Sequence, residues 1–341
     1  MRGAIRQLVA RQLPAPSRSL SSPPDDGADD NVDMTWEHTL RQWVSARSSE
    51  AENVCVDSGD EQRAPVVRTA SLCVASGKGG TGKSIVCASL AELLSARGRT
   101  LVVDADMGVG NAHILHDVHP PRSFVDVVSG RSTVADARVR CAARLDLVGG
   151  GSGVSHMASL SSCELHLIAS GLAEIEHEYE FVLVDSAAGI SDQTLFFASA
   201  CDAVLIVTTP DTTAMTDAYA FIKVLHARRP DVLPLLAVNR VALDGAGADE
   251  LSAERVFQRL DHVCTRFLGF APKAIGAVPD DRAVLRSVAA RRPVVRDAPG
   301  SNAALALRSI AARVQEELSR RAGRGLSRTL SEQLEFFRPD G

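Results

Sequence analysis

Short apolar runs recur along the chain between residues 70 and 320, and polar stretches with helical spacing lie between most of them. The spacing of apolar positions predicts helices over residues such as 84–97, 215–228 and 253–267. Continuous apolar strands separated by helices are typical of a sheet that is buried on both faces. We therefore expect an α/β fold with a mostly parallel sheet flanked by helices on both faces. The runs read as strands are SLCVAS, TLVVDA, RLDLVG, FVLVDS, AVLIVTT, LPLLAVN and AIGAVP.

The pattern is different before residue 70. Residues 14–32 are rich in proline and aspartate, which is typical of a disordered linker. Over residues 34–47 the side chains of Trp36, Leu40 and Trp43 share one helical face, so a short helix is expected there. That helix would either pack on the main domain or bind a partner. Residues 1–69 are interpreted as an N-terminal extension, residues 70–320 as the main domain and residues 321–341 as a tail.

Composition narrows the class of protein. The chain has 341 residues, a formal net charge of -5 and 45% hydrophobic residues, which is ordinary for a globular protein. Its seven cysteines are scattered without a C-x-x-C pair, which indicates reduced thiols and argues against zinc and iron–sulfur sites. The first twenty residues carry four arginines and no acid. We interpret them as a basic arm, with an organelle transit peptide as the alternative.

A glycine-rich loop follows the first predicted strand and precedes a predicted helix. Its residues fit the pattern G-x-x-x-x-G-K-[ST], in which backbone N–H groups surround phosphates. In that pattern Lys83 reaches the β and γ phosphates and the Ser84 hydroxyl binds Mg²⁺. The loop consists of Gly77, Lys78, Gly79, Gly80, Thr81, Gly82, Lys83 and Ser84.

Three aspartates follow neighbouring strands and are expected at the same edge of the sheet. Asp185 ends the run FVLVD, and Asp104 and Asp106 follow TLVV. A lone aspartate at a strand end is often a helix cap, but three beside a phosphate loop favour a magnesium site with Asp185 near the metal.

The loop has a second lysine, and its sequence resembles the deviant Walker A loop of the MinD/ParA ATPases. The resemblance covers about residues 71–314 and implies ATP and Mg²⁺ as cofactors, with Lys78 reaching the nucleotide of the partner in a homodimer. It also implies that Asp106 positions the water and that Asp104 contacts the metal through a bound water. Asn111 matches the motif around Asp106, and Asp217 matches an acidic position near the signature lysine.

Several segments resemble most the FlhG/FleN branch of that family, which sets flagellar number and placement. They are FVLVDSAAGISDQTLFF, TTPDTTAMTDAYAFIK, LAVNRV and GAVPDDRAVLRSVAARRPVV. The resemblance implies a flagellar GTPase or a transcription regulator as partner. Members of this branch commonly carry an N-terminal motif that activates their GTPase partner. In this chain only the similar segments AIRQLV and TLRQWV occur.

The expected base is adenine. A GTPase needs N-K-x-D after its strand, whereas this chain has Asn239, Arg240, Val241 and Ala242, and alanine has no side-chain acceptor for the guanine edge. By resemblance, Asn239, Arg240 and the backbone near Pro279 form the base site.

Residues 282–328 contain eleven arginines and three acids, which would suit DNA or anionic lipid if the charges are not simply solvated. In the tail, Leu326, Leu330, Leu334 and Phe337 form one apolar stripe. The stripe is interpreted either as an amphipathic membrane-targeting helix, which the family often has, or as a helix packed on its own domain.

Three classes of function follow. The first is a membrane-cycling ATPase that is cytoplasmic and peripheral at the inner face of the membrane and regulates flagellar assembly. The second is a ParA-type ATPase whose dimer binds DNA nonspecifically, and the third is a nucleotide-switched interaction protein that does not hydrolyse ATP. The flagellar motifs favour the first, and intact Lys78 and Asp106 argue against the third.

Overall fold

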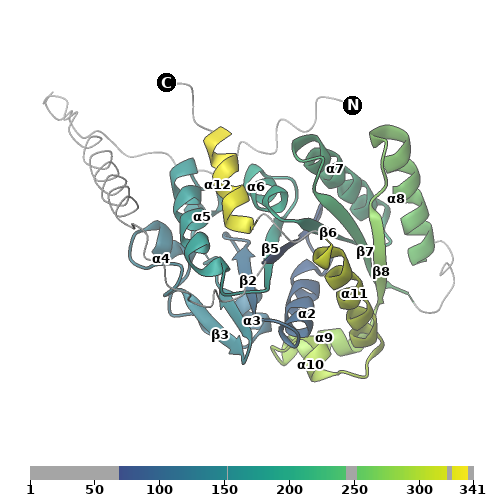
Figure 1. The fold of residues 1–341 in the computed structure, drawn as a ribbon. Helices are drawn as coiled ribbons and strands as arrows, with labels where there is room; N and C mark the ends of the chain where they lie inside the picture. The colour runs from purple at the N-terminus through teal and green to yellow at the C-terminus, as the bar shows by residue number, and fades with distance from the viewer. Residues whose placement is uncertain (1–68, 152, 243–251, 321–324, 337–341) are drawn as a thin grey trace, which may run out of the picture. The chain divides into compact units, whose positions relative to one another are not determined.

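The computed structural model describes residues 69–151, 153–242, 252–320 and 325–336. The predicted short helix over residues 34–47 and the basic arm lie outside the described residues, as does Phe337 of the tail. Strands and helices alternate along most of the described chain, as the apolar runs predicted (Figure 1).

The described strands form one eight-stranded sheet in the order β3-β4-β2-β5-β1-β6-β7-β8. All neighbouring strands are parallel except β3 and β4, which are antiparallel. This confirms the predicted fold class. The strands are β1 (Ala70–Ser76), β2 (Thr100–Ala105), β3 (Arg138–Ala142), β4 (Leu145–Val148), β5 (Phe181–Ala188), β6 (Ala203–Thr208), β7 (Leu233–Val241) and β8 (Lys273–Pro279).

Helices cover both faces of the sheet, because successive side chains of each strand point to opposite sides. In β1, Cys73 packs into one core and Leu72 into the other. The first core is covered by α4 (Phe124–Val128), α5 (Ser162–Glu176), α6 (Asp192–Ala200), α7 (Thr212–Arg228), α8 (Ala253–Leu268) and α12 (Leu326–Phe336). The second is covered by α2 (Lys83–Ser95), α3 (Ala112–Leu115), α9 (Arg282–Ala289), α10 (Val294–Asp297) and α11 (Asn302–Ser319). A short 3₁₀ turn spans Ser155–Ala158.

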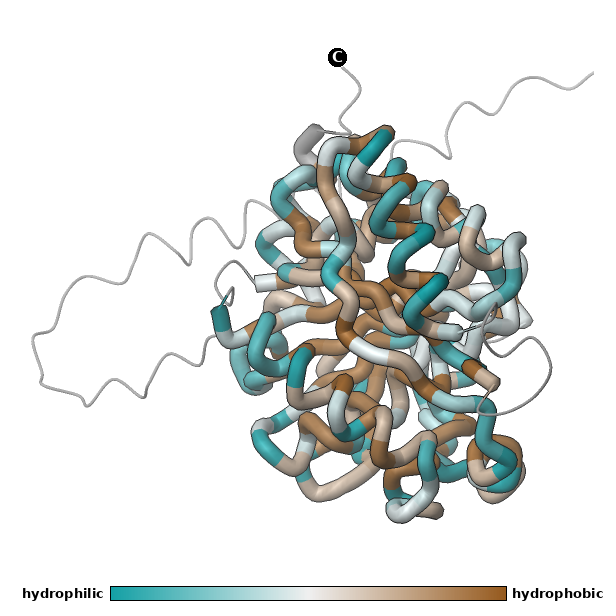
Figure 2. The backbone as a smooth tube through the Cα atoms, turned by 90° about the vertical axis from the view of Figure 1, so that its right-hand side faces the viewer, coloured by the Kyte–Doolittle hydropathy of each residue, from teal (hydrophilic) through white to brown (hydrophobic). Residues whose placement is uncertain are grey.

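Figure 2 shows the most hydrophobic residues in the middle of the molecule and the hydrophilic residues on the outer helices. The strands β1 and β6 are buried along their whole length, which explains why they read as continuous apolar runs and not as alternating patterns.

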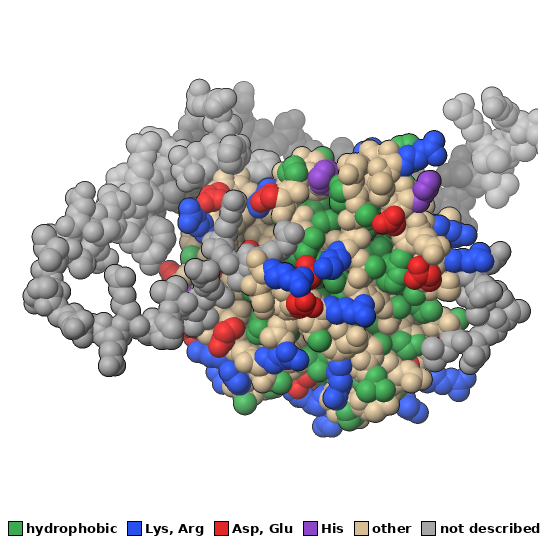
Figure 3. All heavy atoms as spheres, turned by 45° about the vertical axis from the view of Figure 1, so that its right-hand side comes forward, with side chains coloured by type: hydrophobic (Ala, Val, Ile, Leu, Met, Phe, Trp, Pro, Cys, Tyr) green, Lys and Arg blue, Asp and Glu red, His purple; other side chains and the backbone are tan. Residues whose placement is uncertain are grey.

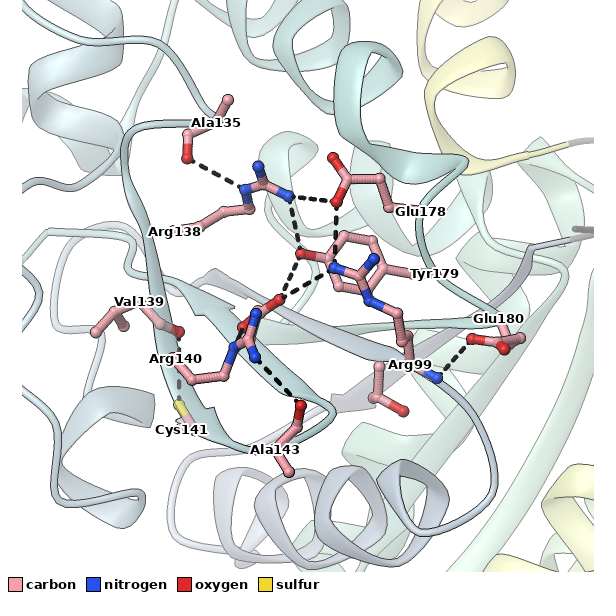
Figure 4. Close-up of polar contacts among 12 residues, drawn as sticks. Arg99, Ala135, Arg138, Val139, Arg140, Cys141, Ala143, Glu178, Tyr179 and Glu180 are labelled. Atoms are coloured by element: carbon pink, nitrogen blue, oxygen red, sulfur yellow. Dashed lines mark hydrogen bonds and ion pairs between the residues drawn. The ribbon is translucent and has the colours of Figure 1, made fainter.

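The strand β3 was not predicted, because its sequence RVRCA has arginines where the other strands are apolar. A polar cluster holds it against the sheet (Figure 4). Arg138 donates hydrogen bonds to the Glu178 carboxylate at 2.9 Å and to the Tyr179 hydroxyl at 3.2 Å. That hydroxyl donates to Asp146 of β4 at 2.8 Å, and burial raises the pKa of Tyr179 to about 12. The arginines of β3 therefore neutralise carboxylates and also keep an edge strand charged.

The described part of the tail, helix α12, packs on its own domain, which is the second of the two interpretations of the apolar stripe. Leu326, Leu330 and Leu334 are buried in the first core, and α12 lies against α5 and α6. Its first turn is held by Glu176 at the end of α5, whose carboxylate accepts hydrogen bonds from the Leu326 amide at 2.5 Å and the Ser327 amide at 2.9 Å. In this arrangement the three leucines of the stripe that the structure describes are turned toward the core and not toward a membrane. No helix in the described part of the chain has the length and apolarity to cross one.

Candidate functional site

The phosphate loop joins the carboxyl end of β1 to the amino end of α2. Gly80 and Gly82 have φ of 82° and 88°, a left-handed conformation that glycine adopts without strain. A Cβ at Gly77 would lie 2.2 Å from the carbonyl oxygen of Asp217, so the loop begins pressed against α7. At Gly79 and Gly80 a Cβ would meet nothing within 4 Å, so this part of the loop borders open space. The buried Thr81 hydroxyl has no hydrogen-bond partner in the described structure.

Lys83 is the buried lysine of the loop. Its ammonium donates to the Asp185 carboxylate at 3.0 Å, and the two side chains are 8% and 2% exposed. Burial acts to lower the pKa of Lys83, but the charge and hydrogen bond of Asp185 outweigh it and raise the pKa. Lys83 also lies 3.4 Å from the Ser84 hydroxyl. The sheet thus brings together Lys83, Ser84 and Asp185, as the sequence predicted.

The strand-end aspartates also meet at this edge. Asp104 and Asp185 are direct partners in the β2–β5 register, and Asp104 is fully buried. Its carboxylate accepts hydrogen bonds from the amides of Asp106 and Ala112, each at 3.2 Å, so it shapes the loop that carries Asp106. A Cβ at Gly110 would lie 2.5 Å from that carboxylate.

Burial and the neighbouring charge of Asp185 raise the pKa of Asp104 to about 8. Two buried carboxylates that repel each other are suited to a nearby cation. The described residues contain no group of three or more His, Cys, Asp or Glu side chains that could hold a metal by themselves. The residues present fit Mg²⁺: the Ser84 hydroxyl would hold the ion together with the phosphates, and Asp104 and Asp185 would act on it through bound water.

Lys78 lies in a different environment from Lys83. Its side chain is 44% exposed, and its ammonium donates to the Thr213 hydroxyl at 2.6 Å and lies 3.5 Å from the Asp211 carboxylate. Asp211 and Thr213 were not singled out from the sequence, although an aspartate just before a helix is a capping signal. Asp217, expected near Lys78 by resemblance, lies in α7 against Gly77, the residue before Lys78.

Asn239 and Arg240 lie beside the loop at the end of β7. The side-chain amide of Asn239 donates to the Thr81 carbonyl at 2.8 Å, which ties β7 to the phosphate loop. Arg240 is exposed and has a φ of 58°, a left-handed conformation that is uncommon for a residue with a Cβ. Pro279 of β8 pairs with Val241 of β7, so the three residues assigned to the base lie on adjacent strand ends. Asn111 is the N-cap residue that precedes α3, and it is exposed.

The sequence of this chain matches a known protein family and several known proteins. Residues 69–314 match the family model described as cellulose biosynthesis protein BcsQ. The chain is 32% identical over 244 residues to the antiactivator FleN of Pseudomonas aeruginosa, which covers 71% of this chain and 85% of FleN. It is 31% identical over 233 residues to the flagellum site-determining protein YlxH of Helicobacter pylori, covering 68% of this chain and 76% of YlxH.

Solved structures show the same fold. The septum site-determining protein MinD of Pyrococcus horikoshii, complexed with Mg-ADP, superposes with a TM-score of 0.63 at 22% identity, covering 74% of this chain and 99% of MinD. That MinD structure holds Mg-ADP, and the loop, Lys83, Ser84 and the two buried aspartates of this chain fit ATP and Mg²⁺. The chain therefore belongs to the MinD/ParA family of P-loop ATPases, and its similarity to FleN and YlxH is consistent with the FlhG/FleN branch of that family.

Proposed function

We propose that this protein is a Mg²⁺-dependent ATPase that hydrolyses ATP across a homodimer interface and regulates flagellar number or placement. The observation that carries the proposal is the contrast between the two lysines of one loop. Lys83 is buried on Asp185, where it serves the phosphates of its own subunit. Lys78 is exposed at the open side of the loop, where a second subunit has access to it.

The surface around the site supports a partner subunit. Val109, in the loop after Asp106, is 65% exposed, and Ile190, in the loop after β5, is 48% exposed. Both loops follow strands whose carboxyl ends form the nucleotide edge. Exposed apolar side chains at such an edge favour burial against another protein surface.

Two variants test the shared site. Lys78→Ala should still bind ATP, because Lys83 and the loop amides remain, but it should not form the ATP dimer and should hydrolyse ATP very slowly. Asp106→Ala should lose hydrolysis yet accumulate the dimer. The loss of a transition-state contact typically lowers the rate about 10³-fold. Sedimentation with ATP separates the variants, and a Lys78→Ala protein that dimerises and turns over like wild type contradicts the proposal.

The flagellar process rests on the relatives, which are named as an antiactivator and as a flagellum site-determining protein. We infer a transcription regulator or a flagellar GTPase as the partner, and the name antiactivator favours the first of these. Co-purification of the ATP-bound Asp106→Ala dimer with each candidate from the same organism would identify the partner. Retention of neither protein would contradict this part of the proposal.

Cycling on the inner face of the cell membrane is the second part of the proposal. It requires α12 to leave α5 and α6, because its three leucines are buried in the described structure. Deletion of residues 326–341 should then abolish ATP-dependent binding to anionic liposomes while ATP binding remains. Binding that survives the deletion would exclude the tail as the membrane contact.

Binding of the ATP-bound dimer to DNA is the alternative to membrane binding, and one observation favours it. Arg282, Arg286, Arg292 and Arg308 are exposed, and none forms an ion pair within the described chain. Figure 3 shows Lys and Arg side chains gathered along the lower part of one face. Other arginines of this region are neutralised; for example, Arg296 pairs with Glu92 at 2.6 Å. ATP-dependent binding to plain duplex DNA, measured beside liposome binding, separates the two alternatives.

A further inference from the structure

The amino end of α7 holds Lys78 through two side chains. The lysine ammonium donates to the Thr213 hydroxyl at 2.6 Å, and that hydroxyl donates to Asp211 Oδ1 at 2.6 Å. Asp211 Oδ1 also lies 3.5 Å from the ammonium itself. The three groups form a continuous chain from the phosphate loop to α7, which we call the lysine dock (Lys78, Asp211 and Thr213).

The acceptor of this dock is fixed in place. Asp211 is the N-cap of α7 and accepts a hydrogen bond from the Ala214 amide at 2.8 Å. Its other carboxylate oxygen accepts from the Thr209 hydroxyl. Burial opposes ionisation, but these donors and the nearby Lys78 together hold the pKa of Asp211 well below its ordinary value, so it remains charged at neutral pH.

The lysine, by contrast, is easily moved. Its ammonium group is carried on a flexible four-carbon stem. The side chains of Lys78 and Asp211 are 44% and 51% exposed. Exposed ion pairs are weak, so a stronger anion can displace Asp211. The triphosphate of a second subunit is such an anion, and it carries more charge than a diphosphate.

We infer that Asp211 and Thr213 are positioning residues that retain Lys78 on its own subunit until the triphosphate of a partner displaces them, and that they thereby set the threshold for dimer formation. This inference rests on the proposed shared site. Each dimer must empty two docks, so the effect of one dock on the dimer dissociation constant is squared. If releasing one lysine from its dock costs about a threefold factor in the equilibrium, the two docks together change the dimer dissociation constant about ninefold.

The test compares Asp211→Asn and Thr213→Val with wild type in the full-length protein. Asparagine caps a helix as well as aspartate does but lacks the charge, and valine has the shape of threonine without the hydroxyl. The control is Asp231→Asn, which removes an exposed, ion-paired carboxylate just before β7, at the opposite edge of the sheet.

Two measurements are made on each protein. The rate at which an amine-acylating reagent modifies Lys78, followed by mass spectrometry without nucleotide, reports the dock alone. Sedimentation with ATP reports the dimer. We expect Asp211→Asn to raise the acylation rate and to lower the dimer dissociation constant about ninefold, with a smaller effect for Thr213→Val and none for the control.

The outcomes are distinguishable. An unchanged acylation rate in Asp211→Asn would show that no dock exists, and a raised rate with an unchanged dissociation constant would show that the dock does not govern dimer formation. Either result overturns the inference and leaves the shared site standing. Absence of an ATP dimer in every protein, wild type included, overturns the proposed function and this inference with it.

Discussion

Glu176 is placed where its charge stabilises the tail helix and not its own helix. It is the last residue of α5, and a negative charge is unfavourable at a helix C-terminus. The same carboxylate lies at the amino end of α12, where a negative charge is favourable, and it accepts hydrogen bonds from two amides and the Ser327 hydroxyl. We therefore predict that Glu176→Ala releases α12 from the domain.

The magnitude follows from these contacts. A hydrogen bond to a charged group contributes about 1.5–3 kcal/mol, but the amides freed by the substitution can bond to water once the helix leaves, so the three contacts do not add in full. We take about 3 kcal/mol for the whole group, which raises the undocked population about a hundredfold. Glu176→Gln keeps the shape and loses the charge, so its effect should be intermediate.

Hydrogen exchange read by mass spectrometry is the assay, because it reports local opening without global unfolding. Amides of residues 326–334 should exchange about a hundredfold faster in Glu176→Ala, while those of β1 and β6 are unchanged. The control is Glu332→Ala, which removes an exposed ion pair with Arg328 of the same helix. Such pairs contribute about 0.3–0.5 kcal/mol, so exchange should change about twofold. Unchanged exchange in Glu176→Ala would refute the reasoning.

Three further predictions follow from buried groups. Lys83→Ala should weaken ATP binding about a hundredfold, because a charge-assisted contact to phosphate contributes about 3 kcal/mol; isothermal titration measures this, and affinity within about threefold of wild type would contradict the phosphate-loop assignment. Asn239→Ala removes the hydrogen bond to the Thr81 carbonyl and should weaken ATP binding about tenfold, whereas the exposed control Asn302→Ala should not. Burial lowers the pKa of His116 to about 4 from its ordinary 6.5, so the unfolded chain binds the extra proton first as the pH falls. The protonation of His116 should therefore lower the free energy of unfolding by about 3 kcal/mol between pH 6.5 and 4. Denaturant titrations at a series of pH values measure this free energy, and its dependence on pH should be weaker by that amount in His116→Leu.

The sequence determined the sheet and the nucleotide edge, because both depend on local patterns. A strand buried on both faces must be apolar throughout, so β1 and β6 were visible as runs. In a parallel sheet the carboxyl ends of the strands share an edge, so residues following different strands converge without further information. This is why Asp104 and Asp185 could be placed together before their register was known.

Only the tertiary structure decided which contacts the exposed and polar groups make. The partners of Lys78, Asp211 and Thr213, lie more than a hundred residues away in the chain, and no local pattern links them to the loop. The tail stripe was compatible with a membrane and, nearly as well, with a protein core; only the structure places Glu176, α5 and α6 against α12. An amphipathic pattern states that a face must be covered but not by what, because that depends on residues distant in the chain.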